Sequence, residues 1–162
     1  MKINDELCNG CQNCFARCPS YAISMIKRSQ PIKLYVDPKQ VDESKIREIC
    51  LRAHMHPKQI ACDCTGTFVE EIVASILKGA KNPTDITRLT GARSGCKQFC
   101  IQPMLRLLEA AGIHVSPANG WQWYGRTPTV WEVPNEIKQK HHAHRFDDDA
   151  RFIEKLIGES ES

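Results

Sequence analysis

Four cysteines near the start of the chain follow a tight spacing that suits a metal cluster. Cys8, Cys11, Cys14 and Cys18 lie in the run CNGCQNCFARCP, which obeys the pattern C-x2-C-x2-C-x3-C-P. A cubane cluster needs thiolates that arrive from several directions, and two-residue steps wrap sulfurs and backbone N–H groups around it. Gly10 allows the backbone to approach closely. Zinc usually takes two separated pairs of ligands, so this spacing predicts one [4Fe-4S] cluster rather than zinc.

The same segment resembles the bacterial [4Fe-4S] ferredoxins over residues 1–60, including Cys18-Pro19 and the Ala22-Ile23 that follows. In two-cluster ferredoxins the fourth cysteine of such a run ligates the other cluster, and this chain has no second full run. Three residues are therefore candidates for the fourth ligand: Cys50 first, as a remote cysteine, then Cys18, then His56. If Cys50 is not a ligand, we expect it to be a small buried hydrophobic residue.

A second set of four cysteines has a different spacing. Cys62 and Cys64 form a C-x-C pair, Cys96 follows after 31 residues, and Cys100 follows after three more. Cys64 and Cys100 each precede a predicted helix, where the macrodipole and free N–H groups favour the negative charge of a ligated cluster. We predict a [2Fe-2S] cluster here, and zinc bound by the same thiolates is the alternative.

Residues 61–112 resemble the [2Fe-2S] domain of bacterioferritin-associated ferredoxin, in which a C-x-C pair, a spacer and a closing cysteine pair bracket a small helical fold. The usual closing pair is C-x2-C, whereas this chain has three residues in the gap. Its stretch TRLTGARSGCKQFC is closer to variants that accompany flavin-dependent amino-acid and amine dehydrogenases, which read like TRAGMGRCQGRFC. The resemblance implies a flavoprotein dehydrogenase as partner.

The predicted elements place these cysteines in distinct surroundings. Strands are expected before and after the first cysteine run, and helices around the second. A capping box of Thr67 and Glu70 begins a helix that Gly79 ends. The other expected elements are strands at 1–4, 22–26 and 32–36 and helices at 44–54, 84–91 and 100–112.

We expect an α+β fold in three parts. Residues 1–60 form a small ferredoxin-like α+β domain, residues 61–115 a small all-helical [2Fe-2S] domain, and residues 116–162 a C-terminal docking arm. The arm carries Trp121, Trp123 and Trp131 among prolines and ends in an amphipathic helix at 148–157, and its aromatic residues suit either a partner or local packing.

The composition excludes several classes of protein. The chain has 162 residues, nine cysteines and a net charge of +3. No apolar stretch follows the opening MKINDELC, so we expect reduced thiols in the cytoplasm rather than a secreted disulfide framework. No run of roughly eighteen apolar residues predicts a membrane span. The dispersed charge gives no argument for nucleic acid, and no segment is expected to build a substrate pocket.

We therefore predict an iron-sulfur electron-transfer subunit of a cytoplasmic oxidoreductase complex, with no catalytic residue of its own. It would relay single electrons between a flavin-containing dehydrogenase, bound as a hetero-oligomer, and an acceptor. Two other functions are kept open: an iron- or metal-handling protein, and a redox sensor in which one cluster is labile.

Overall fold

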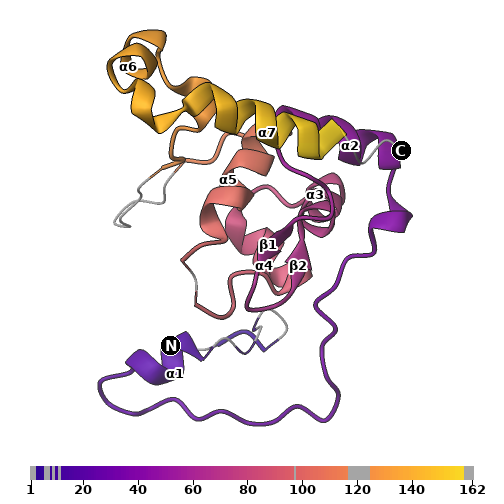
Figure 1. The fold of residues 1–162 in the computed structure, drawn as a ribbon. Coiled ribbons are helices and arrows are strands. Elements are labelled where there is room, and N and C mark those ends of the chain that lie inside the picture. The colour runs from indigo at the N-terminus through magenta and orange to yellow at the C-terminus, as the bar shows by residue number, and fades with distance from the viewer. Residues whose placement is uncertain are drawn as a thin grey trace.

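A computed structural model describes residues 3–5, 8, 10, 12–96, 98–116 and 125–158. Most of its regular structure is helical. Figure 1 labels the helices and strands and colours the chain from the N-terminus to the C-terminus. The helices are α1 (Asn13–Arg17), α2 (Glu43–Arg52), α3 (Val69–Leu77), α4 (Pro83–Thr90), α5 (Ile101–Ala110), α6 (Asn135–Lys140) and α7 (Phe146–Gly158), with 3-10 turns η1 (Pro38–Gln40), η2 (Val130–Glu132) and η3 (His142–His144). The strands are β1 (Ile60–Cys62) and β2 (Thr67–Phe68).

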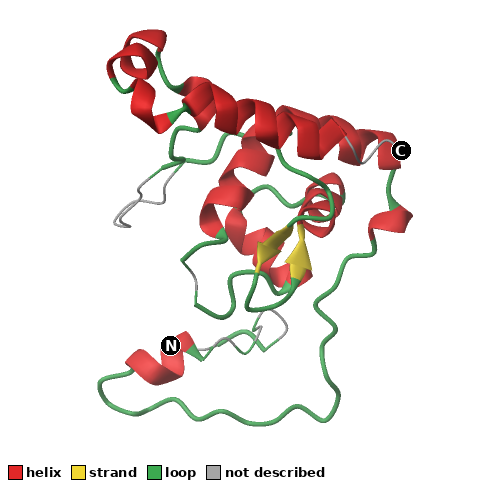
Figure 2. Cartoon of the chain, in the orientation of Figure 1, coloured by secondary structure: helices red, strands yellow, loops and turns green. Residues whose placement is uncertain are grey.

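The segment before α2 contains α1 and a long stretch without regular structure, drawn as a loop in Figure 2. The strands predicted at 22–26 and 32–36 are wrong, and residues 3 and 4 of the predicted first strand are not in a strand either. A strand needs a neighbour to satisfy its backbone hydrogen bonds. These residues lie largely in solvent instead, and Ile26 is 86% exposed. Residues 1 and 2 lie outside the described part of the chain.

Four helices enclose the hydrophobic core. Helix α2 contacts α3 and α5, and α4 also contacts α3 and α5. Each helix directs an apolar stripe inward because its apolar residues recur every three or four positions. The fully buried side chains include Ile72, Ile86, Met104, Leu107 and Leu108. This packed core supports the loops and strands at its edge.

Helix α2 belongs to this core although it precedes residue 61. Its Ile46, Ile49 and Cys50 are buried with residues of α3 and α5. The segment that leads into α2 is anchored by Val36, which is 4% exposed. The division of the chain into domains between residues 60 and 61 stays a prediction. Helix α2 lies before that division but shares one core with helices that lie after it.

The three helices predicted between residues 67 and 112 are confirmed as α3, α4 and α5, with one correction to the residue at which α3 begins. Thr67 lies in β2 and hydrogen-bonds Thr65, so it does not cap α3. The N-cap is Phe68, whose N–H donates to the carboxylate of Glu71 at 2.7 Å. The pairing of β1 with β2 moves the start of the helix by one residue, and the capping acid moves from Glu70 to Glu71.

The C-terminal extension packs against the helical core. Arg126 forms ion pairs with Glu109 of α5 and with Glu132 of η2. The ring of Trp131 stacks on His54 at 3.9 Å, and its indole N–H donates to Glu154 of α7 at 3.0 Å. Trp131 therefore packs locally, and Trp121 and Trp123 lie outside the described residues.

Helix α7 confirms the predicted terminal helix and begins two residues earlier than expected. Its Ile157 is buried, whereas Phe152 is 63% exposed. No helix among the described residues has the length and apolar character needed to cross a bilayer. Many helices and one small antiparallel sheet confirm the α+β class, although the sheet lies at the start of the second region.

Candidate metal centres

The second cysteine set is gathered at one edge of the helical core. Cys62 ends β1, Cys64 lies in the turn between β1 and β2, Cys96 lies in the loop after α4, and Cys100 is the N-cap of α5. The hairpin and the loop thus bring together residues that are more than thirty positions apart in the sequence.

The four thiols lie as two neighbouring pairs. The Cys62 and Cys100 thiols lie close enough to affect each other's pKa and are 3% and 2% exposed, while the Cys64 thiol affects the pKa of Cys96 and both lie at the surface. Within the part of the chain that the structure describes, no three His, Cys, Asp or Glu side chains converge on a single metal-ion position. A [2Fe-2S] cluster contains two irons, each held by two thiolates, and four thiols in two pairs provide that number of ligands.

Backbone N–H groups point at these sulfurs. The Arg93 N–H donates toward Cys62 Sγ at 3.5 Å, and the Cys96 N–H donates toward Cys64 Sγ at 3.4 Å. Such donors stabilise thiolates and the negative charge of a cluster bound to them.

The thiol pKa values differ within the buried pair. Burial, followed by the charge of the neighbouring Cys62, raises the pKa of Cys100 to about 12. Burial also acts to raise the pKa of Cys62, but hydrogen bonds from Thr65 and Arg93 together hold it below the usual value. The backbone N–H of Gln98, followed by the Cys64 thiol, lowers the pKa of Cys96.

Gly95 lets this loop fold closely over the thiols. A Cβ atom at Gly95 would lie 2.6 Å from Cys64 Cβ and 2.9 Å from Cys64 Sγ. No side chain fits at that distance without moving the hairpin or the loop. The close approach of the two backbones therefore depends on this residue.

The first cysteine set lies around α1. Cys14 is the second residue of the helix, Cys18 is its C-cap, and Cys8 lies in the irregular segment before it. Cys11 lies outside the described residues. None of the described residues between 3 and 35 is buried, so these described residues form no core of their own.

Cys18 is the member of this set with the clearest polar surroundings. Its Sγ accepts the N–H of Ala22 at 3.3 Å and lies 3.7 Å from the hydroxyl of Ser20. These hydrogen bonds, that of Ala22 first, lower the pKa of Cys18. A sulfur held by N–H and O–H donors is suited to act as a thiolate ligand.

The structure does not bring Cys50 to this set. Helices α1 and α2 lie far apart in Figure 1, and Cys50 is 1% exposed within the core. Burial, followed by the charge of Glu70, raises the pKa of Cys50 to about 12. The amphipathic pattern of α2 turns this thiol inward, which matches the alternative of a small buried hydrophobic residue. The identity of the fourth ligand itself stays a prediction.

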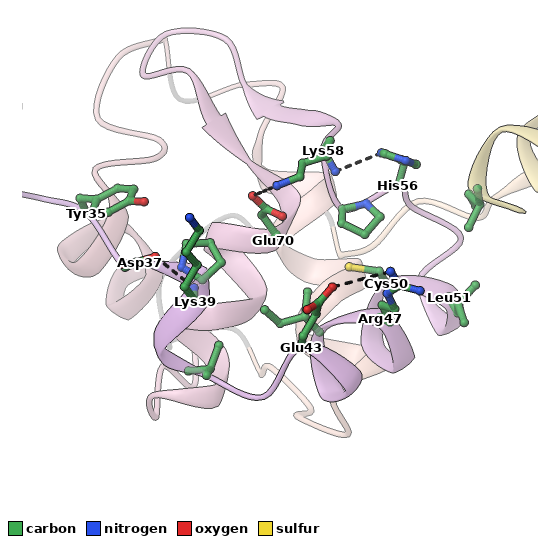
Figure 3. A pocket seen from close by; sticks show the side chains of 15 residues that line it. Tyr35, Asp37, Lys39, Glu43, Arg47, Cys50, Leu51, His56, Lys58 and Glu70 are labelled. Carbon is green, nitrogen blue, oxygen red and sulfur yellow. Dashed lines mark hydrogen bonds and ion pairs between the residues drawn. The ribbon is translucent and has the colours of Figure 1, made fainter. Parts of the chain in front are cut away.

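Cys50 and His56 instead line a pocket of about 550 Å³. Figure 3 shows this pocket between α2 and the segment that bears Lys58, with an ion pair between Lys58 and Glu70 at its wall. His56 Nδ1 accepts the backbone N–H of Lys58 at 3.0 Å. The sequence gives no sign of this pocket, because the pocket forms only when α2 packs beside α3 and the end of α7.

Arg28 is a residue that the sequence analysis missed. Its guanidinium donates to the backbone carbonyls of Asp5 and Cys8, across about twenty residues of chain. No local pattern marks such a contact, because an exposed arginine in an irregular segment has no periodicity.

The comparisons with known proteins agree with both sets. Residues 1–24 match the family model of a 4Fe-4S binding domain, and residues 60–110 match that of a BFD-like [2Fe-2S] binding domain. The chain therefore joins a 4Fe-4S binding domain to a BFD-like [2Fe-2S] binding domain. Comparisons with curated proteins and with solved structures found no match.

The residues of the BFD-like domain fit the cluster that its family binds. Four thiols in two pairs, two N–H donors and the space over Gly95 provide ligands, hydrogen bonds and close backbone approach. The cluster supplies one-electron redox chemistry when bound, and the protein sets its potential through hydrogen bonds and burial. In the 4Fe-4S binding domain, Cys18 is already held by polar donors that suit a thiolate ligand.

Both domains therefore support an iron-sulfur electron-transfer role for the chain.

Proposed function

We propose that this chain is the electron-transfer subunit of a cytoplasmic oxidoreductase complex. It passes single electrons between a flavin-containing dehydrogenase and an acceptor such as a quinone, a ferredoxin or another subunit. The observation that carries the proposal is the succession of a 4Fe-4S binding domain and a BFD-like [2Fe-2S] binding domain in one short chain. Two one-electron centres suit a partner that releases two electrons one at a time.

The proposed ligands are Cys8, Cys11, Cys14 and Cys18 for the [4Fe-4S] cluster and Cys62, Cys64, Cys96 and Cys100 for the [2Fe-2S] cluster. Two observations support Cys18 over Cys50 as the fourth ligand of the first cluster. Cys18 borders the described thiols of α1, and Cys50 is enclosed by the core of α2, α3 and α5. His56 lines the pocket of Cys50 beside α2 and is disfavoured because α2 lies far from α1.

The exposed pair of the second site is the proposed contact point for electrons. Cys64 and Cys96 lie at the surface, and Phe99, between the ligands of the same loop, is 76% exposed. A large exposed aromatic residue beside a redox centre provides contact area for a partner. The inner pair, Cys62 and Cys100, anchors the cluster to α5 and β1.

Isolation of the tagged chain from its native host, without oxygen, tests the partner. We expect a flavoprotein to copurify, and addition of that flavoprotein's substrate should reduce both clusters. Replacing Phe99 by Ala should weaken the association while the iron content stays unchanged. Leu51→Ala is the matched control, since Leu51 is an exposed apolar residue on α2, outside both cysteine sets and outside residues 116–162. Purification without a flavoprotein, with clusters present, would contradict the dehydrogenase partner.

A second function, iron or metal handling, is favoured by one observation. The surface pair of Cys64 and Cys96 offers accessible thiols from which an iron acceptor can take metal. In that case the second cluster should transfer its iron to an apo-acceptor protein or a chelator much faster than the first cluster does. Equal resistance of both clusters to a chelator favours electron transfer.

A further inference from the structure

Arg28 links the chain before the first cysteine run to the chain after it. One guanidinium nitrogen, Nη2, donates to the carbonyl oxygen of Cys8 at 2.8 Å and also to that of Asp5. Both carbonyls belong to the segment that enters the cysteine run. The side chain thus holds together two stretches that share no strand pairing in the described part of the chain.

The contact places a permanent positive charge next to a proposed cluster ligand. Arginine stays protonated at any ordinary pH, and its guanidinium has no acceptor atoms. It neutralises the negative ends of two carbonyl dipoles, one of which belongs to the residue that carries the first thiol. The hydrogen bond to the Cys8 carbonyl therefore places the guanidinium charge close to the residue that carries the first proposed ligand.

We propose that Arg28 raises the reduction potential of the [4Fe-4S] cluster. The proposal rests on the proposed function, in which Cys8 is a ligand. Reduction adds one electron to the cluster, so its charge becomes more negative by one. A nearby cation stabilises this reduced form more than the oxidised form, and net charge and hydrogen bonding are known determinants of cluster potentials.

Three variants of the full chain separate the charge from the geometry. Arg28→Gln removes the charge and keeps a single amide donor. Arg28→Lys keeps the charge and offers a single ammonium nitrogen in place of the guanidinium Nη2 that donates to both carbonyls. Lys27→Gln removes the adjacent charge, which lies on an exposed residue and is not a donor to either carbonyl.

The measurement is an anaerobic redox titration with dithionite, followed by electron paramagnetic resonance, with iron and sulfide counted for each variant. At a fixed poise we expect the ratio of reduced to oxidised [4Fe-4S] cluster to fall about tenfold in Arg28→Gln, or about 59 mV for a one-electron couple. Arg28→Lys should recover most of this loss, and Lys27→Gln should match the unaltered chain. The [2Fe-2S] signal should not shift in any variant.

Three outcomes would overturn the proposal. They are an unchanged potential in Arg28→Gln at full iron content, an equal shift in Lys27→Gln, and cluster loss in both Arg28 variants, which would make the residue a structural staple only. Absence of a [4Fe-4S] signal from the unaltered chain would instead overturn the proposed function, and iron and sulfide counts distinguish the two failures.

Discussion

The two cysteine regions differ in what holds their thiols in place. In the BFD-like domain the thiols are positioned by β1, β2 and α5 on a packed core, and two of them are almost fully buried. In the first region no described residue between 3 and 35 is buried, and the thiols depend on α1 and local hydrogen bonds. The comparison indicates that one site is preorganised by protein packing, whereas the other gains its order mainly from its cluster.

The largest expected effect concerns the ligands of the less packed region. Replacing Cys18 by Ala should abolish the [4Fe-4S] cluster and remove about four irons per chain. Replacing Cys50 by Ala should leave iron and sulfide unchanged, because its thiol is enclosed by the core. Iron and sulfide analysis of anaerobically purified protein checks both variants. Loss of the [4Fe-4S] signal in Cys50→Ala would contradict the ligand set proposed for the first region.

A pair of isoleucines tests the difference in packing directly. Ile72 is fully buried in α3, and Ile72→Ala should lower the free energy of unfolding by about 2–5 kcal/mol through lost burial and a cavity. Ile26 is 86% exposed, so Ile26→Ala should change stability by less than about 0.5 kcal/mol. Urea unfolding followed by circular dichroism gives both values. Equal losses would mean that residues 3–35 possess a core of their own.

Gly95 tests how tightly the packed site is built. Gly95→Ala places a Cβ atom 2.6 Å from Cys64 Cβ, so the hairpin or the loop must move. We expect a cost of about 1–3 kcal/mol and a lower [2Fe-2S] content with the [4Fe-4S] content unchanged. Gly158→Ala is the control, since nothing lies within 4 Å of its added Cβ. Full [2Fe-2S] occupancy in Gly95→Ala would argue against close packing over the thiols.

The smallest effect is expected in the C-terminal extension, which also packs against the helical core. Arg126, and then the Thr129 N–H, lower the pKa of Glu132 to about 2, below its usual value of about 4.3. A lowered folded-state pKa gives a contribution that is complete above about pH 5 and is lost as pH falls towards about 2. The melting temperature of Glu132→Gln should therefore be lower than that of the unaltered chain at pH 6. The two melting temperatures should approach each other near pH 2.5.

Glu43→Gln is the control for this pH dependence. Glu43 forms an exposed ion pair with Arg47 at 3.6 Å and should contribute little at either pH. A difference for Glu132→Gln that stays constant with pH would show that the ion pair with Arg126 does not stabilise the extension.

The sequence predicted the helical region well because its signals are local. Apolar residues recur at helical spacing around Ile72 and Leu107, and glycines at 79 and 112 follow the ends of their helices. The cysteine spacings predicted both cluster types and their order for the same reason. Cys100 at the N-terminus of a helix was also predictable, because Pro103 marks a first helical turn.

The errors arose where tertiary contacts decide the structure. Residues 22–26 and 32–36 have strand-like composition but no strand partner among the described residues, and composition alone does not reveal a missing neighbour. The ranking of Cys50 as fourth ligand stays a prediction; it relied on distance along the chain, whereas the packing of α2 against α3 determines where the thiol points. The contacts of Arg28 and the pocket beside α2 likewise join residues far apart in sequence.

The central claim is that one short chain carries two clusters of different type. Iron, sulfide and zinc should be counted after anaerobic purification, with paramagnetic resonance spectra before and after dithionite. The account predicts about six irons and six sulfides per chain and two separable signals in the reduced protein. Thiolate-bound zinc, or a single cluster type, would contradict it, because one cysteine region would then be structural and no electron could pass between two centres.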